Sequence, residues 1–159
     1  MPDSCARGAR FWNFPRVAVE EAVVNAIYHR SYEEREPIEV RITHEDLVVL
    51  SFPGPDRSIN MDDLRTGKAV CRRYRNRRVS GFLKELDLTE ERSTGIPKIL
   101  KAMKANGSPH PEFESDEDRL SFLIRLPVHK RTAHEMTLRL DDHAEARDAP
   151  YVGTKSGPS

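Results

Sequence analysis

Two short apolar segments, separated by only two residues, constrain the fold of this chain most strongly. The segment from Glu36 to Thr43 alternates apolar and mostly charged or polar side chains, which predicts a half-buried strand. The segment from Asp46 to Phe52 is more continuously apolar and predicts a second strand. Because only His44 and Glu45 separate them, the two strands should pair as an antiparallel hairpin. The apolar face of the first strand consists of Ile38, Val40 and Ile42.

Helical spacing and strand-like runs predict the remaining elements. Asn60 is suited to cap a short helix, and Gly67 is suited to end it. A third strand is expected near the end of the ordered region. Helices are expected at residues 15–30, 61–65, 74–86 and 93–105, and the third strand at residues 120–126. We therefore expect an α+β fold, a mostly antiparallel sheet with helices packed on one face.

Length and composition favour one domain with a loose end. The chain has 159 residues, with 26 basic and 26 acidic side chains and no net charge, so a general affinity for nucleic acid or membranes is not expected. We expect a lead-in at residues 1–14, one domain at 15–126 and a disordered tail at 127–159, because residues 141–159 contain no Leu, Ile, Phe or Met. No apolar membrane span or signal peptide is evident, and Cys5 and Cys71 stand apart, so we expect a cytoplasmic protein with free thiols.

The first helix carries a candidate site along one edge. Glu21, Asn25 and His29 follow one another at four-residue spacing and form a stripe beside Ala18 and Ala22. A carboxylate and an amide one turn apart can meet a ligand or a hydrated cation. The alternative is a solvated helix flank. The buried face of this helix is expected to be an apolar arc, which also contains Glu20; its members are Val17, Val19, Val23, Val24, Ile27 and Tyr28.

A basic segment between Arg65 and Arg78 is the strongest charge asymmetry of the chain. It holds seven cationic side chains and no acidic one, with Tyr74 among them. Guanidinium groups bind phosphate oxygens in pairs, so the segment is a candidate contact for a nucleotide or for DNA. The alternative is a solvated loop balanced by the acidic residues at 112–118. The candidate phosphate-binding residues are Arg72, Arg73, Arg75, Arg77 and Arg78.

The residues from Glu20 to Tyr32 resemble the signature E-A-hydrophobic-hydrophobic-N-A-x-x-H-R-D-Y. This signature belongs to RecG-related ATP-dependent DNA helicases and transcriptional regulators, in a C-terminal domain that diverges from the GHKL ATPase fold. Residues 37–40, 47–54, 63–67, 75–76, 88–96 and 111–113 resemble further motifs of the family in the same order. The likeness covers roughly residues 15–126, and it implies a degenerate GHKL fold.

This resemblance implies a nucleotide site and roles for its residues. Glu21 would be the catalytic base that polarises water, and Asn25 would bind Mg²⁺. The residues that would contact ATP are Asn25, His29, Gly54 and Gly95. The usual adenine-binding Asp is absent, Phe52 stands at the equivalent turn, Ser93 replaces the first glycine of the lid, and no P-loop is present. We therefore expect an ATP-binding domain with weak or absent hydrolysis; the alternative is a DNA- or protein-binding regulatory module without nucleotide.

Overall fold

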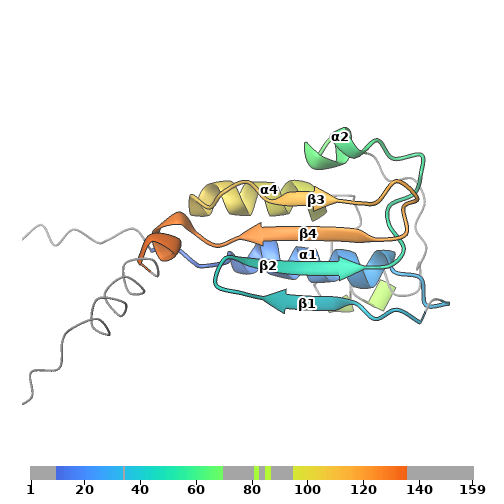
Figure 1. Cartoon of the computed structure of the whole chain (residues 1–159), viewed down its shortest axis with the longest axis horizontal. Helices are drawn as coiled ribbons and strands as arrows, with labels where there is room; N and C mark the ends of the chain where they lie inside the picture. Colours follow the sequence, from blue (N-terminus) through green and yellow to red (C-terminus); the bar gives the residue numbers. More distant parts are fainter. Residues whose placement is uncertain (1–9, 34, 70–80, 83–84, 87–94, 136–159) are drawn as a thin grey trace, which may run out of the picture.

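One antiparallel sheet forms the front of the molecule, and the helices α1 and α4 lie behind it (Figure 1). The computed structural model describes residues 10–33, 35–69, 81–82, 85–86 and 95–135. Within these ranges the strands are β1 (Glu39–Ile42), β2 (Asp46–Ser51), β3 (Glu112–Glu114) and β4 (Phe122–Pro127), in the order β1-β2-β4-β3. The helices are α1 (Arg16–His29), α2 (Met61–Arg65) and α4 (Gly95–Asn106). The expected α+β fold, with helices on one face of an antiparallel sheet, is confirmed.

The β1–β2 hairpin is the one that the sequence predicts. Val40 lies opposite Val49, and Thr43 donates its backbone N–H to the Asp46 carbonyl at 2.8 Å, which closes the turn. The chain then returns through β4, which pairs with both β2 and β3. Strand β3 was not expected from the sequence, because it is only three residues long and directly follows Pro111. Its pairing with β4 comes from tertiary contacts that no local pattern shows.

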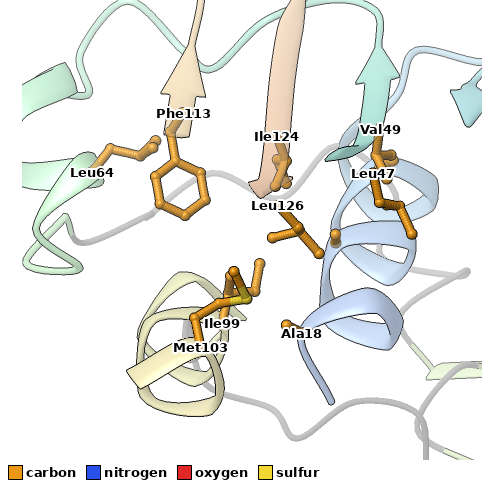
Figure 2. Close-up of a cluster of buried hydrophobic side chains, with 11 residues drawn as sticks. Ala18, Leu47, Val49, Leu64, Ile99, Met103, Phe113, Ile124 and Leu126 are labelled. Atoms are coloured by element: carbon orange, nitrogen blue, oxygen red, sulfur yellow. The ribbon is translucent and has the colours of Figure 1, made fainter. Parts of the chain in front are cut away.

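The core lies between the sheet and the two long helices (Figure 2). The register aligns one inward row across all four described strands, and a second row runs beside it. Ile99 and Met103 of α4 close the core from the helix side. The first row consists of Val40, Val49, Ile124 and Phe113, and the second of Ile42, Leu47 and Leu126.

Only the β1 residue of each row is exposed, which corrects the expectation of a half-buried β1. Val40 remains 51% exposed and Ile42 65% exposed, although both point to the face that carries the core. The main contacts of α1 with the sheet are to β2 and β4, so α1 leaves most of β1 uncovered. An apolar face is buried only where a second layer reaches it.

Helix α1 buries an alanine face, and the expected apolar arc is only partly correct, because Val19 and Val23 pack half-buried against the core but do not form its centre. Ala18, Ala22 and Ala26 are buried in the core cluster, whereas Val17 is 49% exposed. Small side chains let α1 approach α4 and β2 closely, so this face is preferred over the valine-rich arc. Glu20 is half-exposed at the helix surface and pairs with Arg16 at 2.6 Å.

The expected ends of α2 are confirmed. The Asn60 side chain caps α2 by accepting a hydrogen bond from the Asp62 N–H at 2.8 Å. Gly67 and Gly107 adopt positive φ angles after α2 and α4, as residues that end helices often do. Of the helix expected at 74–86, only residues 81–82 and 85–86 are described. Of the helix expected at 93–105, residues 93–94 lie outside the described part.

Residues 128–135, which were expected to belong to a disordered tail, include two buried residues and a short helix. Val128 and His129 are buried, and the His129 ring stacks on Phe11 with the centroids 4.3 Å apart. Residues 130–135 are helical. Local period is lost after Pro127, but Val128 and His129 gain burial through contacts with Glu45 and with the segment before α1. Residues 136–159 lie outside the described part of the chain.

The outer face of the sheet carries a charged network around Asp46. The Asp46 carboxylate is buried and accepts hydrogen bonds from the Thr43 hydroxyl, at 2.8 Å, and from Arg125. Arg125 also pairs with Glu112 at 3.0 Å, so the network connects β2, β4 and β3. Burial raises the pKa of Asp46, but these hydrogen bonds and the charge of Arg125 hold the pKa below its ordinary value.

Within the described ranges, no helix is long and apolar enough to cross a bilayer.

Candidate functional site

Glu21 lies between α1 and α4 and forms an ion pair there. Its Oε1 atom is 3.0 Å from the Nζ atom of Lys98, and the two side chains are 12% and 32% exposed, respectively. The nearly complete burial of the carboxylate is sustained by this cation, because an unpaired buried charge is costly. The expected catalytic base is therefore a paired carboxylate.

Asn25 occupies the next turn of α1 and contacts the first residue of α4. Its Nδ2 atom donates a hydrogen bond to the Glu21 carbonyl at 2.8 Å. A methyl group on Gly95 would lie 2.3 Å from Nδ2 and 3.1 Å from Oδ1, so the amide fills the space that any other side chain would need. Glycine is thus required at position 95 for Asn25 to keep this conformation.

The structure brings three predicted site residues and one unexpected residue to one place. Glu21, Asn25 and Gly95 meet where α1 and the start of α4 pack, and Lys98 completes the group. Sequence reasoning missed Lys98 because its partner is 77 residues away. The sequence pointed to Lys98 only indirectly. A carboxylate such as Glu21, expected beside small alanine side chains, needs a nearby cation when it is buried. The α1 stripe is therefore covered by α4 and is not a solvated flank.

His29 ends α1 one turn beyond Asn25, as its place on the stripe predicts. Its ring meets Tyr28 edge-on, with the centroids 4.9 Å apart. A nucleotide contact for His29 stays a prediction.

Gly54 packs against a turn formed by residues 115–121. Its N–H donates to the Arg119 carbonyl at 2.8 Å, and a methyl group there would lie 2.6 Å from the Ser121 carbonyl oxygen. Asp116 holds this turn, and the backbone N–H of Leu120, followed by the groups of Ser121, lowers the pKa of Asp116 to about 2. This close approach alone explains the glycine. The nucleotide-binding role of Gly54 stays a prediction.

Most of the basic segment lies outside the described residues, including all five candidates: Arg72, Arg73, Arg75, Arg77 and Arg78. Arg65, at its start, has a structural role. The guanidinium pairs with Asp62 at 3.1 Å, and its Nε atom donates to the Phe113 carbonyl at 3.2 Å, which ties α2 to β3.

The donors at the α1–α4 site suit a cation that is held mainly by other oxygens. No group of three or more His, Cys, Asp or Glu side chains within the described ranges can hold a metal ion. Mg²⁺ commonly takes one or two protein ligands and completes its octahedron with phosphate and water. The Asn25 amide oxygen fits that limited role, because the hydrogen bond of Nδ2 fixes the nitrogen as the donor.

Comparison with known proteins relates this chain to a protein family and to a solved structure. The family described as "Putative ATP-dependent DNA helicase recG C-terminal" matches residues 36–124, a range that includes Gly54, Gly95 and Lys98 and begins after α1. The crystal structure of the DIP2311 protein from Corynebacterium diphtheriae is similar, with a TM-score of 0.63 and 27% identity. The likeness covers 74% of this chain but only 24% of that one, so this chain spans about a quarter of its length. No curated protein matches.

Proposed function

Because this chain belongs to the family described as the C-terminal domain of RecG-type ATP-dependent DNA helicases, we propose that it is an ATP-binding regulatory domain. The proposed nucleotide site lies where α1 meets the start of α4. The observation that carries the proposal is the convergence of Glu21, Asn25, Gly95 and Lys98 at that junction.

The chemistry of these residues fits the triphosphate end of a magnesium nucleotide. The backbone N–H groups at the start of the twelve-residue helix α4, except at Pro97, which has none, favour an anion, and Lys98 adds a positive charge three residues after Gly95. The Asn25 amide oxygen would hold the cation. When bound, Mg²⁺ would neutralise phosphate charge. The chain's own residues then orient the nucleotide between the two helices.

We propose that hydrolysis is slow or absent. Glu21 can polarise water only with a carboxylate oxygen that faces it, and Oε1 is engaged by Lys98. The chain also lacks the adenine-binding Asp, with Phe52 at the equivalent turn, and it has Ser93 in place of a lid glycine. ATP-dependent phosphate release that disappears in Glu21→Ala would contradict this proposal.

Asn25→Ala should weaken Mg²⁺-dependent ATP binding about ten-fold or more while the fold is retained, because a ligand to a charged group is lost. Gly95→Ala should have the same effect, since its methyl group displaces the Asn25 amide. Titration with ATP and MgCl₂, followed by amide chemical shifts, measures both.

Val17→Ala is the matched control, because Val17 lies on the exposed side of the same helix. It should bind ATP like the wild type. If the folded wild type shows no shift changes at millimolar ATP, the nucleotide proposal is wrong. The second candidate, a protein- or DNA-binding module without nucleotide, would then remain. It is favoured by the way Glu21, Lys98 and Asn25 already satisfy one another.

We also propose that the segment from Arg65 to Arg78 binds DNA without sequence preference, supported by its seven cations and lack of acids. If about four cations contact phosphates, the logarithm of the binding constant should fall with the logarithm of the salt concentration with a slope near −3.6, about −0.9 per phosphate. Reversal to Glu at four positions should abolish duplex binding in a fluorescence-anisotropy titration. The four positions are Arg72, Arg73, Arg77 and Arg78.

Two controls accompany the DNA measurement. Arg57→Glu reverses an exposed cation outside the segment, and removal of residues 136–159 spares the buried Val128 and His129 and the helical residues 130–135. Both should leave binding nearly unchanged. If the folded wild type fails to bind duplex DNA at low salt, the DNA proposal is wrong. The alternative, that the arginines are balanced by nearby acidic residues and do not contact nucleic acid, would then hold.

A further inference from the structure

Strand β1 presents an open edge to solvent. It is the terminal strand of the sheet, and within the described ranges no strand pairs with its outer side (Figure 1). All four of its residues are exposed, including the apolar Val40 and Ile42 on the inward face. An edge with exposed apolar side chains is suited to pairing with another strand.

The hairpin determines which backbone groups of β1 face outward. Thr43 donates its N–H to Asp46 of β2, so Arg41 and Glu39, two and four residues earlier, also direct their backbone groups to β2. The N–H and C=O groups of Val40 and Ile42 therefore point to the open edge. A further antiparallel strand must bond these two residues.

The charges of β1 make the edge complementary to itself. In β1 only the even-numbered residues direct their backbone N–H and C=O groups to the open edge. Two copies of β1 can therefore pair antiparallel only in registers that place even-numbered residues opposite even-numbered residues. With Val40 opposite Val40 of the partner subunit, Glu39 lies opposite Arg41 of the partner subunit. The two-fold axis repeats this contact, so the interface contains two such pairs of opposite charge. The neighbouring registers place Glu39 opposite Glu39 of the partner subunit, or Arg41 opposite Arg41 of the partner subunit. Like charges in opposite positions are unfavourable, so one register is preferred.

We propose that β1 pairs antiparallel with β1 of a second copy of this chain, centred on Val40, and thereby extends the sheet across a two-fold axis. The pairing bonds the outward backbone groups of Val40. It places Ile42 beside Ile38 of the partner subunit on the inward face, so apolar surface that the helices leave exposed is covered. The reciprocal Glu39–Arg41 contacts lie on the outer face of the joined sheet. The interface is isologous, as two-fold symmetry requires.

Charge reversal tests the interface in the full-length chain. Glu39→Arg and Arg41→Glu each replace two attractive contacts by two repulsive ones, and each should raise the dimer dissociation constant about ten-fold or more in sedimentation-equilibrium experiments. The double variant, with both reversals, should restore dimerisation. Glu114→Arg makes the same charge change as Glu39→Arg at an exposed position of β3, at the other edge of the sheet, and should leave the dimer unchanged.

A cysteine crosslink tests the register. In a Cys5→Ser, Cys71→Ser background, Val40→Cys should form a disulfide across the axis, because directly opposite bonded residues have Cα atoms about 5.5 Å apart, within disulfide reach. Arg41→Cys should not crosslink in the same background, since its own copies are not opposite each other. A wild type that stays monomeric up to millimolar concentration overturns the proposal. A dimer that ignores the charge reversals also overturns it.

Discussion

Gly54→Ala is expected to lower the free energy of unfolding by about 3 kcal/mol, a large effect for one methyl group. The new carbon would lie 2.6 Å from the Ser121 carbonyl oxygen and 2.9 Å from that of Arg119. Both are backbone atoms, and Ser121 is fixed further because Asp116 accepts hydrogen bonds from its N–H and hydroxyl. The turn cannot move away cheaply, so the strain falls on the fold. Urea unfolding, monitored by circular dichroism, measures the change.

Gly81→Ala is the matched control for this variant. Position 81 is helical, and a methyl group there would have no neighbour within 4 Å, so the same substitution should be neutral or stabilise the protein by about 0.5–1 kcal/mol. If Gly54→Ala is as stable as the wild type, the packing explanation for Gly54 is wrong. Its glycine would then need another reason, such as the predicted contact with a nucleotide.

The elements whose chemistry is local were predictable from the sequence. The turn at His44 and Glu45 leaves no room for any connection except a hairpin, and Asn60 carries its cap in its own side chain. Strand β3 was not predictable, because its three residues pair with β4 only after the chain has returned. The burial of Val128 and His129 was hidden for a similar reason, since their neighbours, such as Phe11, come from the other end of the chain.

The candidate site was half predictable. Four-residue spacing on one helix aligned Glu21 with Asn25, and the family resemblance pointed to Gly95. The spacing does not predict which residues lie opposite Glu21 and Asn25. Their neighbours are determined by the antiparallel packing of α1 on α4, which places Lys98 against Glu21 and Gly95 against Asn25. In the resulting site, Glu21 is already paired with Lys98. This pairing is one basis of the proposal that hydrolysis is slow or absent.

Hydrophobicity does not identify the buried face of α1. The helix is apolar on most sides, so the valines define no unique inward direction. The decisive property is size, because close approach of α1 to its neighbours requires small side chains at the contact. Ala18, Ala22 and Ala26 provide them at four-residue spacing.

Ala22→Leu should therefore destabilise the protein by about 2–3 kcal/mol, because Ala22 is fully buried in the core cluster and added carbons have no space. The added carbons must push α1 away from α4. That movement should also separate Glu21 from Lys98 and Asn25 from Gly95, so ATP binding should weaken together with stability. Thermal and urea unfolding measure the first effect, and the chemical-shift titration measures the second.

Val17→Leu provides the comparison that separates the two faces of α1. Val17 is exposed, so the larger side chain should change the stability by no more than about 0.5 kcal/mol. If the valine-rich arc were the buried face, the order would be reversed, with Val17→Leu strongly destabilising and Ala22→Leu tolerated. The two variants therefore decide which side of α1 meets α4. They also decide whether Glu21 and Asn25 lie at a helix junction, on which the proposed nucleotide site depends.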